Sequence, residues 1–212
     1  MKKPIATALS LVLLAAACAA PARAGSTKDP VRRLGKTVTQ YRDDVVQAVL
    51  GTRWAAAHHA EDRWTFFELA LRAGGGKPVV IDREDVSLTF PDGTKVNMPS
   101  QKRMAEGVKD VRWLMQKAAV SRDPIDGYFS GVSGSQRLGF FAVPGEAITF
   151  DEVTVNRELM AQGDVFFESP TGKFPPGDYV LSIENKQVRI ELPFSLPARD
   201  WPEKKGDGTV AW

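Results

Sequence analysis

The sequence has few of the residues on which nucleophilic catalysis and metal binding most often depend. It contains a single cysteine, Cys18, which excludes both an intramolecular disulfide framework and a zinc site built from cysteines. Its only two histidines, His58 and His59, are adjacent, so a Ser–His–acid triad or a histidine metal site must use one of them. We therefore predict no catalytic constellation of these types and no cofactor.

The sequence also lacks an excess of charge of one sign. It has 28 Lys and Arg residues against 26 Asp and Glu residues, which gives a formal net charge of +2. Two of the basic residues are Lys2 and Lys3, and without them the chain is neutral. No basic field is left to attract nucleic acid, so we predict no nucleic-acid partner. With 43% hydrophobic and 25% charged residues, the composition is typical of a folded domain.

Residues 1–24 have the pattern of an export signal. Lys2 and Lys3 form a short positive start, and residues 5–20 carry no charge. This apolar stretch is shorter than the ~20 residues that a membrane-spanning helix needs, which makes an uncleaved anchor the least favoured alternative. The protein is therefore predicted to be exported from a bacterial cell.

Two cleavage sites remain open. Lipoprotein-type cleavage before Cys18 would follow Leu14–Ala17 and leave Cys18 as a lipidated first residue. Ordinary cleavage before Gly25 would follow the small-x-small sequence at 22–24. Because the only cysteine lies where lipidation would need it, we predict a cell-envelope protein that is anchored to the membrane through Cys18 and faces the periplasm or the cell surface. A soluble periplasmic or secreted protein is the alternative.

Beyond the signal, the sequence divides into three regions. Residues 25–43 are polar and are predicted to form a tether, with a short helix as the alternative. Residues 44–196 carry regular apolar patterns and are predicted to be a single β-sandwich domain. Residues 197–212 are polar and are predicted to be a flexible tail.

Short strands are predicted where apolar and polar residues alternate. The turns Pro91–Thr94 and Asn185–Lys186 each link two alternating runs, which predicts two hairpins. Gly163–Asp164 is predicted to be another turn. For residues 55–62, which include the end of the first predicted strand, a helix is the alternative prediction. The predicted strands cover residues 46–56, 64–72, 79–82, 86–90, 96–98, 138–143, 148–150, 153–155, 165–167, 179–183 and 188–194.

One helix is predicted, at Gln101–Val120, with Ser100 as its N-cap. Trp113 falls outside its apolar stripe and is predicted to pack over a sheet edge. We therefore predict a mainly β fold, namely an antiparallel immunoglobulin-like β-sandwich with one amphipathic helix inserted near residues 101–120. The apolar stripe of this helix consists of Met104, Val108, Val111, Met115 and Ala118.

Two glycine-containing segments do not match catalytic or phosphate-binding motifs. The Gly-Lys pair at 76–77 lacks both the earlier glycine and the following Ser or Thr of a phosphate loop. The segment 131–135 ends in serine where a nucleophile elbow requires glycine, so we predict a loop. The paired aromatics at 140–141 and 166–167 are predicted to be core residues.

Carboxylates are the remaining candidates for chemistry. Asp82, Glu84 and Asp85 form an acidic cluster without the glycine that a calcium loop requires, and they are predicted to lie at a strand end. Asp151 and Glu152 could join another carboxylate in acid–base work, which requires a suitable separation in space.

His58 and His59 are weak candidates for a metal site, with Glu61 and Asp62 as further ligands. Adjacent side chains of a strand point to opposite faces, and chelation needs three or four convergent ligands. We therefore predict a solvated turn here and no metal.

With the export signal and these patterns, the chain resembles uncharacterised bacterial envelope lipoproteins with immunoglobulin-like domains. The residues that carry the resemblance are Leu14–Cys18, the strand pattern at 64–72 and 79–90 with its Pro91-Asp92-Gly93 turn, and the closing run from Pro176 to Phe194. The resemblance implies a sandwich fold and an envelope location, and it implies no catalytic residue.

Two functions follow as hypotheses. The first is a non-enzymatic binding or structural module of the envelope, whose protein partners the sequence does not name. The second is a secreted carboxylate-dependent hydrolase acting on envelope glycans or peptides through residues such as Asp82, Glu84, Asp151 or Glu152. A concave pocket with two converging carboxylates would favour the second. A metal-handling protein would rest on the two histidines alone.

Overall fold

The computed structural model describes residues 29–60 and 62–199. The predicted export signal, including Cys18, and all but the first residues of the predicted tail lie outside this part of the chain. The described part is mainly β, with 41% strand and 18% helix, which confirms the predicted fold class at this level. None of the helices in the described part is long and apolar enough to cross a membrane.

The larger sheet has six strands in the order β1-β2-β3-β4-β10-β8. All neighbours are antiparallel except β10 and β8, which run parallel. The strands are β1 (Val31–Arg33), β2 (Val38–Arg42), β3 (Val46–Gly51), β4 (Trp64–Ala73), β8 (Gly134–Arg137) and β10 (Leu159–Glu168).

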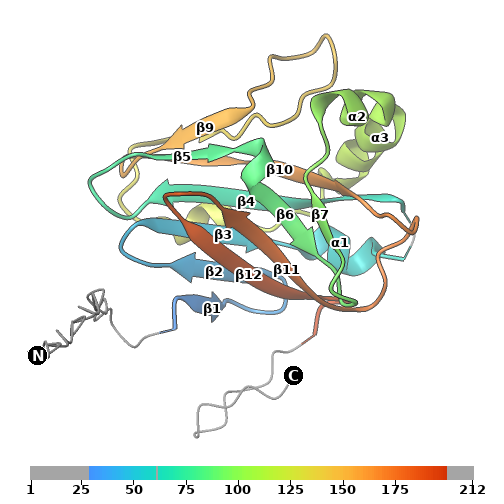
Figure 1. Ribbon diagram of the computed structural model, residues 1–212, viewed down its shortest axis with the longest axis horizontal. Coiled ribbons are helices and arrows are strands. Elements are labelled where there is room, and N and C mark those ends of the chain that lie inside the picture. Colours follow the sequence, from blue (N-terminus) through green and yellow to red (C-terminus); the bar gives the residue numbers. More distant parts are fainter. Residues whose placement is uncertain (1–28, 61, 200–212) are drawn as a thin grey trace, which may run out of the picture.

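A four-stranded antiparallel sheet lies across the larger one (Figure 1). Its order is β12-β11-β6-β7, and it contains both predicted hairpins, β6–β7 and β11–β12. Its strands are β6 (Val86–Thr89), β7 (Lys95–Asn97), β11 (Gly177–Glu184) and β12 (Arg189–Leu196), and a separate pair is formed by β5 (Val79–Asp82) and β9 (Glu152–Val155). The helices are α1 (Arg53–His58), α2 (Gln101–Glu106) and α3 (Val108–Ala118), with 3-10 turns η1 (Arg83–Asp85) and η2 (Ile125–Tyr128).

The two sheets pack together through the inner face of the larger sheet. Because side chains of a strand alternate between its faces, Phe67 and Leu69 of β4 point to the same side. Phe67 meets Phe194 of β12 with ring centroids 4.9 Å apart, a distance typical of a tilted aromatic pair. Thr39 of β2 donates its hydroxyl to the carbonyl of Pro193 at 2.9 Å. The main hydrophobic core therefore lies between the sheets.

The outer face of the larger sheet is covered by α3 and by the segment that follows it. Ile125 and Phe129 of that segment pack on Val49 and Ala70 in a second, smaller hydrophobic cluster. Polar side chains hold the same segment down, because Arg72 of β4 donates to the Ser130 carbonyl at 2.6 Å. The residues after α3 thus form a strap across the sheet, residues 121–133.

Several expectations from the sequence differ from the structure. Residues 31–42, part of the predicted tether, supply two strands of the larger sheet. The strand predicted to reach residue 56 ends at Gly51, and α1 follows it. The alternative prediction of a helix is therefore correct, although the helix begins and ends earlier than the predicted range 55–62. Residues 138–143 and 148–150 are not strands, although 138–143 are largely buried.

The predicted helix is present but interrupted. Gly107 separates α2 from α3, and a Cβ there would lie 2.8 Å from the indole of Trp64. Ser100 caps α2 by accepting a hydrogen bond from the Arg103 amide at 3.2 Å, as predicted. Met104 and Val111 are fully buried, but Trp113 is 43% exposed rather than packed over a sheet edge.

We predict that Val111→Asp destabilises the protein by about 3–5 kcal/mol, because it buries a carboxylate without a partner. Gln116→Asp is the matched control, since Gln116 is exposed on the same helix. Urea unfolding of both variants measures the difference. Equal stability of the two variants would show that this face of α3 is not part of the core.

Candidate functional site

The candidate site is a cleft of about 470 Å³ on the outer face of the larger sheet. Its volume lies within the range of small-molecule sites, roughly 300–1,000 Å³. It opens between β8, β10, the end of α3 and the start of the strap. The lining residues are Met115, Arg122, Ser135, Gln136, Arg137, Gly139, Phe141, Gln162, Gly163, Asp164 and Phe166.

A pair of carboxylates lies beside this cleft, and of the two only Asp164 lines it. Glu68 of β4 and Asp164 of β10 are directly opposite in the strand register, so both side chains are on the outer face. Arg122 joins them: its guanidinium makes two hydrogen bonds to Asp164, at 2.7 and 2.9 Å, and a longer one to Glu68 at 3.4 Å. The fork of the arginine therefore matches Asp164 in the bidentate geometry that is strongest for carboxylates.

Glu68 is buried behind Arg122. Its side chain is 8% exposed, and its second carboxyl oxygen accepts the amide of Asp123 at 2.7 Å. The space for this group exists because residue 51, its neighbour on β3, is glycine. A Cβ on Gly51 would lie 2.9 Å from both the Glu68 oxygen and the Asp123 Cβ.

Burial raises the pKa of Glu68 to about 7, from an ordinary value of 4.5. The loss of hydration is the largest cause, and the negative charges of Asp164 and Asp123 add to it. The Asp123 amide and the charge of Arg122 act in the opposite direction. Arg122 does not restore an ordinary pKa because its closer partner is Asp164.

Asp123 fixes the strap at this point. Its buried carboxylate accepts hydrogen bonds from the backbone amides of Thr52 and Arg53, at 3.1 and 3.0 Å. It also accepts the Thr37 hydroxyl and the Arg53 side chain, each at 3.0 Å. One carboxylate therefore holds together the approach to β2, the start of α1 and the strap.

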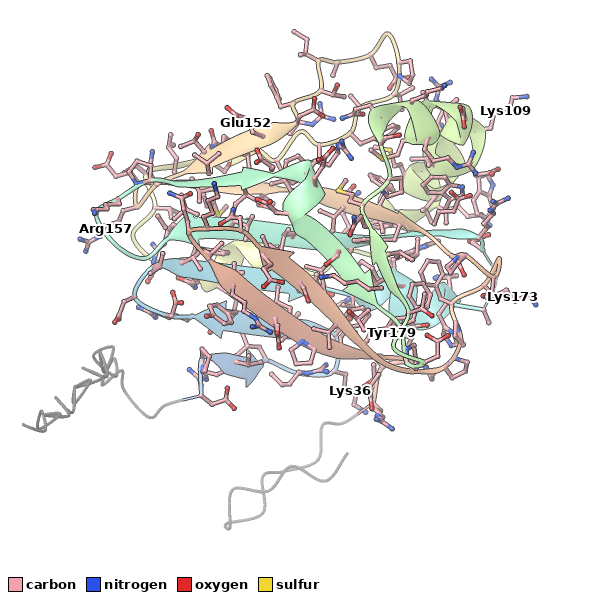
Figure 2. The ribbon with its side chains drawn as sticks, in the orientation of Figure 1. Lys36, Lys109, Glu152, Arg157, Lys173 and Tyr179 are labelled. Carbon is pink, nitrogen blue, oxygen red and sulfur yellow. The ribbon has the colours of Figure 1, made fainter. Side chains whose placement is uncertain are left out.

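The acidic residues singled out from the sequence lie elsewhere. Asp82 and Glu152 are register partners in the β5–β9 pair, and Figure 2 shows Glu152 on β9, on the side of the molecule away from β11 and β12. Glu84 and Asp151 both approach Arg83, but their side chains are 82% and 78% exposed. Asp85 caps the η1 turn. The structure places Asp82, Glu84 and Asp85 at the end of β5, as predicted, and none of the five acids lines the cleft.

The two histidines make separate local contacts. His58 lies in α1, where its ring stacks on Trp54 with centroids 3.8 Å apart. The Nδ1 atom of His59 lies 2.9 Å from the carbonyl oxygen of Phe174. Within residues 29–60 and 62–199, no group of three or more His, Cys, Asp or Glu side chains could hold a metal ion.

Other segments named in the sequence analysis contribute to the cleft itself. Ser135, from the loop predicted at 131–135, lies on β8 and lines it. Both twin aromatic pairs are buried, which confirms them as core residues, and Phe141 and Phe166 meet edge to face on the cleft floor. Gly163 and Asp164, predicted to be a turn, lie in the middle of β10.

The residues that give the cleft its charge are Arg122, Arg137 and Asp164, and neither they nor the buried Glu68 beside them were predicted from the sequence. Glu68 carried a usable signal, because it is an acid within an otherwise apolar run from Phe66 to Leu71. A charged residue inside a buried strand requires a partner. The identity of that partner depends on the pairing of β4 with β10, which local sequence does not reveal.

The raised pKa of Glu68 predicts a specific dependence of stability on pH. An acid that is more basic in the folded state contributes stability fully below its unfolded pKa and loses it as the pH rises through its folded pKa. Between pH 4.5 and pH 7 this amounts to about 3 kcal/mol. Glu68→Gln mimics the neutral acid and should remove this part of the pH dependence.

The measurement is the free energy of unfolding in urea at pH 5 and pH 8 for both proteins. Every other titrating group is common to the two proteins and cancels in the comparison. If the variant lost stability with rising pH as steeply as the wild type, Glu68 would not be a buried neutral acid.

Compared with known proteins, the chain matches no protein-family model, no curated protein and no solved structure.

Proposed function

We propose that this chain is an exported bacterial cell-envelope protein, anchored to the membrane through lipidated Cys18, which acts as a non-enzymatic binding module. The location rests on the positive start, the uncharged run and the cysteine of residues 1–24. The binding role rests on the cleft. The protein presents to the periplasm or the cell surface a rigid sheet whose outer face carries a polar, ligand-sized hollow.

The observation that favours binding over catalysis is the state of the carboxylates. Acid–base catalysis needs a carboxyl group that can reach the substrate. Asp164 is held by both arms of Arg122, and Glu68 is buried against the Asp123 amide. Glu68 does not line the cleft. The fixed Arg122–Asp164 pair is suited to binding a ligand.

We further propose that the six-stranded and four-stranded sheets form a β-sandwich of immunoglobulin-like type. Face-to-face packing through Phe67 and Phe194 supports this proposal, as does the pair of antiparallel hairpins in the smaller sheet. The six- and four-stranded sheets and the parallel β8–β10 pair differ from the seven antiparallel strands of a constant-type immunoglobulin domain, so the proposal concerns the sandwich architecture and not an identical strand order.

The competing function is a carboxylate-dependent hydrolase. The raised pKa of Glu68, opposite Asp164, is the observation in its favour, because hydrolases use one protonated and one ionised carboxyl group. Purified protein should be screened on envelope glycans and on peptides, together with Glu68→Gln and Asp164→Asn. Hydrolysis that both variants abolish would replace the binding proposal with this one, and we expect none.

Anchoring is tested by fractionation of cells that produce the chain. We predict that the wild type sediments with membranes and that Cys18→Ala moves to the soluble envelope fraction, because the lipid attachment site is lost. Ala19→Ser, at the neighbouring position, is the control and should stay with membranes. A mature N-terminus at Gly25, found by mass spectrometry of the wild type, would contradict lipidation.

A further inference from the structure

The cleft is polar on most of its rim. The polar side chains come from three parts of the fold, and a ligand that covers them must offer hydrogen-bond partners, since buried polar groups left unpaired are costly. A purely apolar ligand would leave those donors and acceptors that have no partner within the protein unpaired. The side chains on this face are Arg122 of the strap, Ser135 and Arg137 of β8, and Gln162 and Asp164 of β10. Gln136 also borders the cleft, but its side chain belongs to the opposite face of β8 and donates to the Thr154 carbonyl.

Two arginines enter the cleft, and they are not equivalent. Arg122 is already neutralised by its bidentate pair with Asp164. Arg137 makes no ion pair with any residue in the described part of the chain, and its guanidinium donates one hydrogen bond to the Phe141 carbonyl at 2.8 Å. That bond orients the guanidinium and leaves most of its donors unused. The cleft therefore has one oriented positive charge available to an anion.

The remaining groups suit hydroxyls. Asp164 retains lone pairs beyond those that accept from Arg122, so it can accept from hydroxyl donors. Gln162 is the register partner of Arg137, which places an amide beside the guanidinium on the same face. Ser135 adds a hydroxyl from the same edge strand. The floor below them is the edge-to-face pair of Phe141 and Phe166, whose centroids are 5.3 Å apart.

We propose that this cleft binds a sugar acid, meaning a hydroxylated ring that carries a carboxylate. Arg137 binds the carboxylate with its planar fork, a geometry that lysine does not reproduce. Asp164 and Gln162 bind the ring hydroxyls. This inference rests on the proposed binding function and names the ligand class that the site would take.

The test uses calorimetric titration of the purified, detergent-solubilised full-length protein with glucuronate, galacturonate and mannuronate. The matched neutral probes are the corresponding hexoses, which keep the ring but lack the carboxylate. We expect at least one hexuronate to bind about tenfold or more tightly than its hexose, because hydrogen bonds to charged groups are the strong ones. Acetate, which has the carboxylate without the ring, should bind more weakly than the hexuronate.

Variants assign the effect to Arg137. Arg137→Gln should weaken hexuronate binding about tenfold or more and leave the hexose unaffected. Arg137→Lys should retain part of the affinity, since the charge remains but the fork is lost. Arg157→Gln is the control for charge, because Arg157 is exposed at the left end of the molecule in Figure 2 and does not line the cleft.

Three results would overturn the proposal: no binding of any hexuronate, equal binding of hexuronate and acetate, or equal hexuronate binding by wild type and Arg137→Gln. Unfolding curves of the variants check that they are folded. Because the fractionation experiment with Cys18→Ala does not involve the cleft, a failure here is separable from a failure of the envelope assignment.

Discussion

The outer half of this structure depends on the buried carboxylate of Asp123. A carboxylate removed from water must be hydrogen-bonded, and Asp123 satisfies this requirement with four donors from Thr37, Thr52 and Arg53. The donors belong to segments that are far apart in the chain. The strap can therefore lie on the sheet in one position, and the apolar contacts of Ile125 and Phe129 follow from that position.

The arrangement of charges in the cleft also depends on the hydrogen bonds of Asp123. Arg122 precedes Asp123, so its guanidinium is delivered to Asp164 and Glu68 once Asp123 is in place. Gly51 leaves the room for Glu68 below. As a result, Arg122 is paired with Asp164 within the protein, whereas Arg137 on the edge strand keeps a positive charge at the cleft that is unpaired within the described part of the chain. An acid of raised pKa supports this arrangement from beneath without entering the cleft.

The two faces of the larger sheet have different physical tasks. The inner face carries the aromatic contacts that join the sheets, such as Phe67 with Phe194, and hydrophobic burial there is the main source of stability. The outer face mixes apolar and charged side chains. Polar groups at that depth gain little net stability, but they specify geometry, because each requires its own partner. The candidate site lies on the face where geometry is specified in this way.

The sequence by itself determined the export pattern, the mainly β class, the two hairpins and the helix after Ser100. These features depend on local period and turn chemistry, which neighbouring residues encode. Only the tertiary structure decided that residues 31–42 join the sheet, that the helix is interrupted at Gly107, beside Trp64, and that Gly163 and Asp164 lie within a strand. The cleft belongs to this second group. Glu68 and Asp164 are 96 positions apart in the sequence and become neighbours only because β4 pairs with β10, a choice made by packing across the whole sheet.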